Sequence, residues 1–181
     1  DHANRKSRLD ITKVTTYTSG GNLKIEVELP IMEQSWNPTT NKFDHVMFSI
    51  FLADPNSTSG CAVQPLHRYT LPNGFKWDYC YKPYGFGVSC FSSKGATADV
   101  NGAAVTPIPT SSVDWSPNTT AATKEPGKMT FFIKGATIGN PKSLKGWKLY
   151  INTWDMDFDK LRALQKESVL GTYVYPFGSS E

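Results

Sequence analysis

The sequence predicts an all-β protein, an antiparallel β-sandwich of jelly-roll type, and three observations support this fold class. Short segments of β-branched and aromatic residues recur along the 181 residues. Glycine, proline and asparagine separate these segments, and no amphipathic stretch of crossover-helix length lies between them. The one helix-favouring stretch, 159–167, is too short to dominate a fold. We therefore expect two packed antiparallel sheets joined by turns and loops.

The first strands form a predicted hairpin. Segments 9–18 and 22–29 are rich in β-branched residues, and the Ser19-Gly20-Gly21-Asn22 sequence between them favours a tight turn. In 23–29 apolar and charged residues alternate strictly, which predicts one buried face and one solvated face. Pro30 is expected to end this strand, because proline has no N–H to donate to a neighbouring strand.

The middle of the chain contains a buried strand and a second predicted hairpin. Segment 45–53 is a continuous apolar run, typical of a strand buried on both faces, and Asp54-Pro55 is expected to stop it. Segments 75–81 and 86–92 flank Lys82-Pro83-Tyr84-Gly85, whose composition favours a turn. The sequence therefore predicts an antiparallel pair here.

Three later segments, 129–134, 147–153 and 169–175, complete a set of at least eight strands. Segment 94–127 is the least regular and is expected to hold one or two short strands among surface loops. No repeat or composition shift divides the chain. We therefore expect a single domain over 1–181, with 1–8 as a flexible remnant of a longer N-terminal segment.

Composition excludes two broad classes of protein. The net charge of +3 comes from 19 basic and 16 acidic residues spread along the chain, and the one dense basic run is Arg5-Lys6-Ser7-Arg8. A nucleic-acid binder would concentrate its cations, so no nucleic-acid partner is expected. No apolar run approaches the length of a membrane helix. No signal peptide is present at Asp1, and we expect an exported protein whose signal has been removed.

The three cysteines do not predict a metal site. Cys61, Cys80 and Cys90 show no C-x-x-C spacing and have no histidine at ligand spacing, so zinc is not expected. In an exported protein one disulfide and one free thiol are expected. The sequence leaves all three pairings open.

The sequence does not predict an enzyme. The three histidines, His2, His45 and His67, lie in unrelated contexts. Cys61 and His67 form the one conceivable nucleophile–base pair, but no third orienting group accompanies them. A pair of carboxylates of the glycosidase type is the remaining catalytic alternative, because spacing alone does not reveal such pairs.

A run of alternating aspartates is the candidate metal site. Asp155, Asp157 and Asp159 occupy alternate positions, and calcium prefers oxygen ligands arranged on one side in this way. The glycine and the twelfth-position glutamate of an EF-hand loop are missing, since lysines stand there. The alternative is a polar turn in which one carboxylate orients Arg162.

Aromatic side chains make up 13% of the chain, which favours a surface that stacks on flat ligands. Trp36 lies in a polar loop and is predicted to be a platform for the apolar face of a sugar ring. Trp77 and Tyr79 are expected to share one strand face with Phe75 and Tyr81. That face is predicted to be either a stacking surface or part of the core, and the pattern does not choose between them.

Several longer motifs carry more information than periodicity does. They are Trp36-Asn37-Pro38, Phe43-Asp44-His45-Val46, Thr70-Leu71-Pro72-Asn73-Gly74, Phe91-Ser92-Ser93-Lys94-Gly95-Ala96, Gly139-Asn140-Pro141 and, most specific, the run 149–157. Together these motifs resemble the C-terminal module of certain bacterial α-amylases. They are also similar to the C-terminal domain of glucodextranase, within the DOMON-like group of β-sandwiches. The resemblance extends over about 9–178.

The resemblance implies a non-catalytic sandwich that binds polysaccharide, with starch or a related α-glucan as ligand. It implies a secreted, monomeric module attached to the catalytic domain of an amylase-type glycoside hydrolase. No cofactor is required, and calcium is the ion expected if one is bound. The expected sugar contacts are Trp36, Trp77, Tyr79, Trp154 and Arg162, and the expected calcium ligands are Asp155, Asp157 and Asp159.

Two departures from the family pattern and two alternative functions stay open. In that family an acidic, glycine-rich segment and an aromatic stretch usually precede the first strand. The sequence here begins with Asp1-His2-Ala3-Asn4, so we expect that segment to have been trimmed or to lie in a preceding part of the protein. The cysteines are not part of the family pattern. One alternative is a structural or cell-surface anchoring module of a secreted enzyme. The other is a stand-alone glycoside hydrolase.

Overall fold

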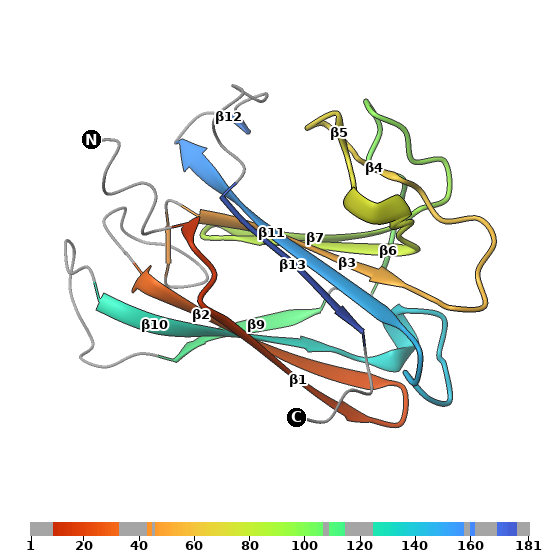
Figure 1. Ribbon diagram of the computed structural model, residues 1–181, viewed down its shortest axis with the longest axis horizontal. Coiled ribbons are helices and arrows are strands. Elements are labelled where there is room, and N and C mark those ends of the chain that lie inside the picture. Colours follow the sequence, from red (N-terminus) through yellow and green to blue (C-terminus); the bar gives the residue numbers. More distant parts are fainter. Residues whose placement is uncertain are drawn as a thin grey trace.

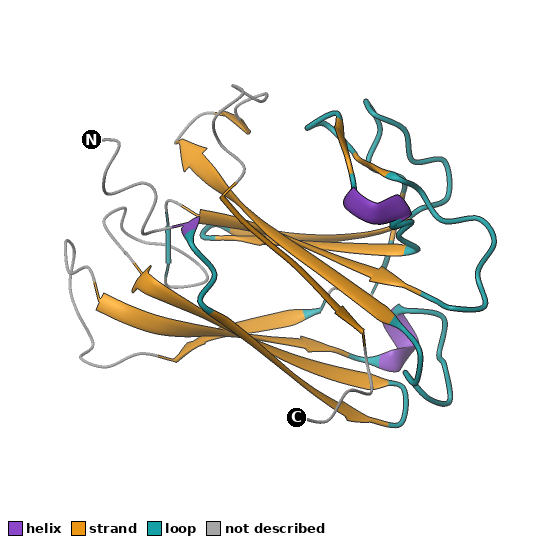
Figure 2. Cartoon of the chain, in the orientation of Figure 1, coloured by secondary structure: helices purple, strands orange, loops and turns teal. Residues whose placement is uncertain are grey.

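Two antiparallel sheets packed face to face confirm the expected all-β sandwich (Figures 1 and 2). The computed structural model describes residues 9–32, 43–44, 46–106, 109–114, 125–157, 160–161 and 170–176, with the backbone alone for 111–114, 125, 155–157, 160–161 and 170–176. Two short 3-10 turns accompany the strands, η1 at Pro72–Gly74 and η2 at Gly135–Thr137.

The smaller sheet has four strands in the order β1-β2-β10-β9. Their bounds are Lys13–Ser19 for β1, Asn22–Met32 for β2, Glu125–Ile133 for β10 and Thr110–Asp114 for β9. The predicted first hairpin is confirmed, because Ser19 pairs with Asn22 across the two glycines. Gly20 adopts a φ of 57°, a left-handed conformation that glycine reaches without strain.

The larger sheet has seven strands in the order β12-β11-β3-β6-β7-β8, and β13 also pairs with β11. The bounds are Lys160–Leu161 for β12, Lys148–Asp157 for β11, Val46–Ala53 for β3, Tyr79–Tyr84 for β6, Gly87–Ser92 for β7, Ala103–Ala104 for β8 and Leu170–Pro176 for β13. Strands β8 and β9 are the short strands expected within 94–127. Every pairing in both sheets is antiparallel.

Two predicted boundaries were wrong. Strand β2 continues past Pro30 to Met32, because Pro30 lies at a β-bulge where the register with β10 shifts between Glu125 and Gly127. At a bulge the regular hydrogen bonding between the two strands is interrupted, so the missing N–H of Pro30 is tolerated there. The second hairpin is confirmed, but its turn lies at 85–86 and β6 begins only at Tyr79. Residues 75–78, which were expected to belong to this strand, form the segment between η1 and β6.

The space between the sheets is filled by one large hydrophobic cluster. Leu23, Ile25, Val27 and Leu29 on β2 are all at most 3% exposed, as their alternation predicted. The Phe131 ring of β10 packs edge-on against Phe48 of β3, with ring centroids 5.2 Å apart, and against Tyr81 of β6, at 5.7 Å. These aromatic contacts join the two sheets, because Phe131 comes from the smaller sheet and the other two rings come from the larger one.

A second cluster lies on the far side of the larger sheet. It consists of Phe51, Ala53, Leu71, Phe75, Trp77, Cys80 and Tyr150. Residues 61–78, which we call the outer cover, lie over this side of the sheet and include η1 with the two-stranded ribbon β4 (Val63–Gln64) and β5 (Tyr69–Thr70) (Figure 1). Strand β3 is buried on both faces as a result, which confirms the interpretation of its apolar run.

The cysteines divide between the two faces of the larger sheet. Cys80 belongs to the cluster under the outer cover, whereas Cys90 on the neighbouring strand belongs to the cluster between the sheets. Cys61 packs against the same cluster as Cys80, and all three thiols are free. Burial raises the pKa of Cys80 and of Cys90 to about 12. Of the three pairings left open, Cys80 with Cys90 is therefore excluded by the sheet between them.

Adjacent phenylalanines of β10 provide a direct test of the sandwich. Phe131 is 0% exposed and Phe132 is 43% exposed. We expect Phe131→Ala to lower the free energy of unfolding by about 3–5 kcal/mol, because it opens a cavity between the sheets. Phe132→Ala is the matched control and is expected to change stability by about 0.5 kcal/mol or less. Urea unfolding measures both, and equal losses would contradict the assignment of faces.

Candidate functional site

Trp77, one of the expected sugar contacts, is completely buried. Its exposed fraction is 0%, and its Nε1–H donates to the carbonyl oxygen of Val63 at 2.9 Å. Trp77 also exchanges two backbone hydrogen bonds with Cys61. Of the two roles left open for Trp77, stacking surface or core, the structure therefore shows the core role. Trp77 and Tyr81 do not share a face, because Trp77 precedes the start of β6 and belongs to the outer cover.

Trp154 is also buried, at 3% exposure, and it ends a chain of buried polar groups on β11. Its Nε1–H donates to Asn152 Oδ1 at 2.8 Å, and Asn152 Nδ2 donates to Gln64 Oε1 at 2.6 Å. Gln64 Nε2 then donates to Ser49 Oγ at 3.1 Å. These hydrogen bonds attach Gln64 of the outer cover to β3 and β11, and they give each of the three buried donors an acceptor. Trp154 therefore has a structural role here, and its ring is not open to a sugar.

His67 lies beside Trp154 under the same cover. The two ring centroids are 4.1 Å apart, and His67 is 3% exposed. Its Nδ1–H donates to the carbonyl oxygen of Pro65 at 3.3 Å. The pKa of His67 is lowered to about 4, chiefly by burial, with a smaller contribution from the charge of Lys82, while the hydrogen bond to Pro65 acts in the opposite direction. His67 is therefore neutral at physiological pH, which suits packing against an indole more than base catalysis.

Lys82 is the buried cation of this region. It is 5% exposed, and its Nζ donates to Asn101 Oδ1 at 2.7 Å. Burial lowers the pKa of the Lys82 ammonium group. The hydrogen bond to Asn101 partly offsets the cost of removing this charge from water, and it fastens the loop before β8 to the sheet.

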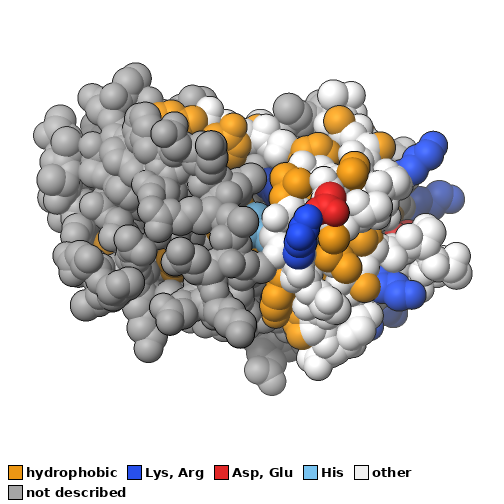
Figure 3. Space-filling model, turned by 90° about the horizontal axis from the view of Figure 1, so that it is seen from above, with side chains coloured by type: hydrophobic (Ala, Val, Ile, Leu, Met, Phe, Trp, Pro, Cys, Tyr) orange, Lys and Arg blue, Asp and Glu red, His pale blue; other side chains and the backbone are white. Residues whose placement is uncertain are grey.

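The described part of the surface above the outer cover mixes apolar and charged side chains. Figure 3 shows hydrophobic side chains scattered among polar ones on the described part, with a basic and an acidic side chain in contact. Leu66 and Val100 are 40% and 51% exposed. Arg68 and Asp99 form an ion pair at 2.7 Å, with both side chains largely in water. Such a pair contributes little to stability.

Tyr79 is half-buried and lines a polar depression of about 540 Å³ at one end of the larger sheet. Its ring stacks on Trp147, with centroids 6.4 Å apart and planes 17° apart. Asp78 in the same depression accepts a hydrogen bond from the hydroxyl of Ser57 and one from the backbone N–H of Asp54, at 2.8 Å. Burial raises the pKa of Tyr79, and the carboxylates of Asp78 and Asp54 raise it further. One face of the Tyr79 ring therefore packs on Trp147, while polar groups surround the depression.

The remaining expected site residues fall at the limits of the described chain. Trp36, Arg162 and Asp159 lie outside the described residues. The backbone of Asp155 pairs with Val46, and that of Asp157 pairs with Lys160. Within the part of the chain that the structure describes, no group of three or more histidine, cysteine or acidic side chains could hold a metal ion. The calcium site stays a prediction.

The most prominent exposed aromatic side chains of the sheets lie on the outer face of the four-stranded sheet. Tyr17 of β1 and Phe132 of β10 are 47% and 43% exposed, and both pair in register with Lys24 of β2. The Lys24 Nζ lies 3.8 Å from the centroid of the Tyr17 ring, a cation–π contact. Because β2 lies between the other two strands, the two aromatic residues are about 10 Å apart along the row. They border a shallow, mainly apolar groove of about 450 Å³.

A carboxylate with three neighbouring donors lies beside this aromatic row. Glu26 accepts hydrogen bonds from Lys24 Nζ at 2.9 Å and from the Tyr17 hydroxyl at 3.4 Å. Lys24 contacts Oε1, whereas the Tyr17 hydroxyl and Lys128 Nζ, the latter at 3.4 Å, both contact Oε2. The hydrogen bond from Lys24 lowers the pKa of Glu26, and the charge of Lys128 lowers it as well. The side chains around the two rings are therefore held in place in the absence of a ligand.

Two features of the sequence indicate that Lys24 and Phe132 lie on the solvated face of the smaller sheet. Strict alternation in β2 predicts that Lys24 points away from the core, and Phe132 follows a residue on the buried side of β10. An aromatic residue on the solvated side of a strand indicates a candidate binding surface. What the sequence did not reveal is the register that brings Tyr17, Lys24 and Phe132 into one row.

Comparison of the chain with models of protein families, with curated proteins and with solved structures finds no match. Among the described residues, no helix is long and apolar enough to cross a membrane.

The buried histidine predicts how stability depends on pH. The folded-state pKa of His67 is about 4 and its ordinary value is 6.5, so the unfolded chain binds the extra proton first. The stabilisation is present in full above about pH 7 and is lost as the pH falls towards 4, by about 3 kcal/mol at most. Urea unfolding of wild type and His67→Asn at several pH values measures this loss as a difference. Parallel pH profiles of the two proteins would contradict a neutral, buried His67.

Proposed function

We propose that this domain is a non-catalytic module that binds polysaccharide, with starch-type α-glucans as the ligand class, through the outer face of the four-stranded sheet. The observation that carries the proposal is the row of Tyr17, Lys24 and Phe132, in which two exposed rings flank an ammonium group. The choice of α-glucan rests on the resemblance to amylase modules described above. An amylase-type glycoside hydrolase as the attached catalytic domain, and export from the cell, rest on the same resemblance.

The row offers both kinds of contact that a sugar chain uses. The C–H groups of a sugar ring pack on an aromatic face, and its hydroxyls exchange hydrogen bonds with charged side chains. Tyr17 and Phe132 provide the rings, and Glu26 and Lys128 provide an acceptor and a donor next to them. Because ion pairs and a cation–π contact already fix Tyr17, Lys24 and Glu26, binding costs little additional side-chain entropy.

The shape of the face favours a chain over a small sugar. The groove beside the row is shallow and open, so one sugar unit would bury little surface there. Two rings about 10 Å apart allow a polymer to make repeated contacts along the sheet. Each contact is weak, and the expected affinity is modest, as suits a module that holds an enzyme on an insoluble substrate.

The proposal changes the expected contact residues. Trp77 and Trp154 are buried and offer no free ring face, and one face of the Tyr79 ring packs on Trp147. Tyr17 and Phe132 take their place as stacking residues. Trp36 and Arg162 lie outside the described residues, and their contribution to binding stays a prediction.

Retention on starch tests the proposal. In affinity electrophoresis through gels that contain amylopectin, Tyr17→Ala and Phe132→Ala are each expected to weaken binding by about three- to tenfold, since each removes one stacking ring. Phe86→Ala is the matched control, because Phe86 is also exposed, at 38%, but lies in the turn between β6 and β7. It is expected to migrate like wild type.

Three outcomes would contradict parts of the proposal. If amylose, amylopectin, dextran and pullulan all leave the migration of wild type unchanged, the α-glucan ligand is wrong. If wild type binds and the two sheet-face variants bind equally well, the location of the site is wrong. Release of reducing sugar from soluble starch by the purified chain would show that the domain is catalytic.

A further inference from the structure

The outer cover carries a four-residue turn between β4 and β5, residues 65–68, which we call the cover tip. Two of its residues, Leu66 and Arg68, adopt left-handed backbone conformations, with φ values of 67° and 52°. Both are strained, because in this conformation the Cβ atom lies too close to the backbone carbonyl oxygen. Leu66 is also 40% exposed, so burial of its side chain offsets little of that strain. Something else must hold the cover tip in this conformation.

The residue between the two strained ones, His67, is the one that the cover tip buries. His67 is 3% exposed, and its ring packs on that of Trp154 with the centroids 4.1 Å apart. The side chains of its neighbours Leu66 and Arg68 are exposed instead. The packing of a neutral imidazole on a buried indole therefore offsets the strain on either side of it.

The charges around His67 do not favour its protonated form. Tyr69, the other aromatic residue beside Trp154, is uncharged at neutral pH, and the charge of Lys82 opposes protonation. Arg68 and Asp99 pair with each other at the surface. Among the described residues, no carboxylate forms a hydrogen bond or an ion pair with the His67 ring. Protonation would therefore place a second cation under the cover without an anion to balance it.

The cover tip has few attachments to the rest of the protein. The N–H of Leu66 donates to the carbonyl oxygen of Ala98 at 2.8 Å. The ion pair between Arg68 and Asp99 lies mostly in water and adds little. Immediately before the tip, Gln64 is completely buried and is fixed by its two hydrogen bonds to the larger sheet. The attachment therefore weakens sharply after Gln64.

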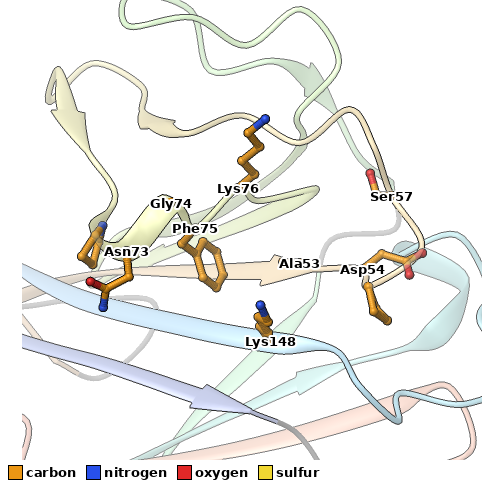
Figure 4. A pocket seen from close by; sticks show the side chains of 10 residues that line it. Ala53, Asp54, Ser57, Asn73, Gly74, Phe75, Lys76 and Lys148 are labelled. Atoms are coloured by element: carbon orange, nitrogen blue, oxygen red, sulfur yellow. The ribbon is translucent and has the colours of Figure 1, made fainter.

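The far end of the outer cover is also firmly attached. Phe75 lines a pocket of about 430 Å³ and points towards Lys148 at the start of β11 (Figure 4). Phe75 is 7% exposed, and its ring packs on Tyr150 with the centroids 5.8 Å apart. Trp77 is completely buried and donates a hydrogen bond to Val63. Residues 65–68 are therefore the described part of the cover that can move while the remainder stays in place.

We infer that the cover tip is an acid-sensitive switch, in which protonation of His67 opens residues 65–68 and uncovers the face of the Trp154 ring on which His67 packs. In the open form the imidazolium returns to water and the strain at Leu66 and Arg68 is released, so both effects favour opening. The ring packing and the hydrogen bond to Ala98 keep the tip closed at neutral pH. The inference does not depend on the α-glucan proposal.

Amide hydrogen exchange of the full chain, followed by NMR, tests the switch at the N–H of Leu66. The pKa of His67 is about 4 in the closed tip and its ordinary value is 6.5, so the closed tip binds fewer protons and opens as the pH falls below about 6.5. Between pH 7 and pH 5, after correction for the intrinsic exchange rate, we expect the open population to rise about twentyfold. An open population that does not change with pH would overturn the inference.

Two other N–H groups distinguish opening of the tip from a general loosening. The N–H of Asn140 donates to Gly135 in the turn after η2, and its protection should be the same at both pH values. The Nε1–H of Trp154 donates to Asn152 below the tip and should stay equally protected. If either group loses protection in parallel with Leu66, acid loosens the protein or the whole cover, and the inference is overturned.

Replacement of the histidine tests the role of its charge. His67→Asn retains a side-chain donor for the carbonyl oxygen of Pro65 but cannot be protonated. The exchange of the Leu66 N–H in this variant should therefore lose its dependence on pH. A twentyfold rise that persists in His67→Asn would show that another group operates the tip and would overturn the inference.

Replacement of the strained leucine tests the role of the backbone. Leu66→Asn introduces a residue that tolerates the left-handed conformation, so the open population should fall about two- to fivefold at each pH while the rise between pH 7 and pH 5 remains. Val100→Asn is the matched control, because Val100 is 51% exposed but has no left-handed backbone, and it should change nothing. An unchanged open population in Leu66→Asn would overturn the role of strain in the switch.

Discussion

All eight residues of β3 are buried, so this strand needs partners on both of its faces. A sheet with one buried face could leave the other to water, as the four-stranded sheet does. The larger sheet instead requires a third layer, and residues 61–78 provide it. Trp77 and His67 of that layer and Trp154 of β11 are buried because they lie where the layer meets the sheet. The solvated face available for stacking among the described residues is consequently the one formed by β1, β2 and β10.

Much of the fold could be predicted from local sequence, because strand alternation and turn composition act over a few residues. Strict alternation in β2 identified its two faces correctly, and the two glycines after Ser19 identified the first hairpin. The same local rules failed at Pro30, since the bulge that accommodates it depends on β10, almost a hundred residues later. The role of Trp77 was undecided for the same reason. A tryptophan in a strand-like segment has no local feature that distinguishes a stacking surface from a second core.

The candidate site was harder to predict than the fold because it depends on register. Tyr17, Lys24 and Phe132 come from three strands, and a shift of one residue in any of them would send a ring to the opposite face. The site therefore follows from tertiary structure, with composition supplying the chemistry.

Hydrogen bonds to β11 join residues that are distant in the chain, and this affects how the protein folds. The hydrogen bond between Gln64 and Asn152 spans 88 positions, and the one from Thr153 to Leu9 spans 144. Chains dominated by such contacts fold slowly, on a scale of about milliseconds to seconds. The cover has no sheet to close on until β3 and β11 have paired. Until then the apolar underside of the cover and the face of β3 that it buries are both exposed to water.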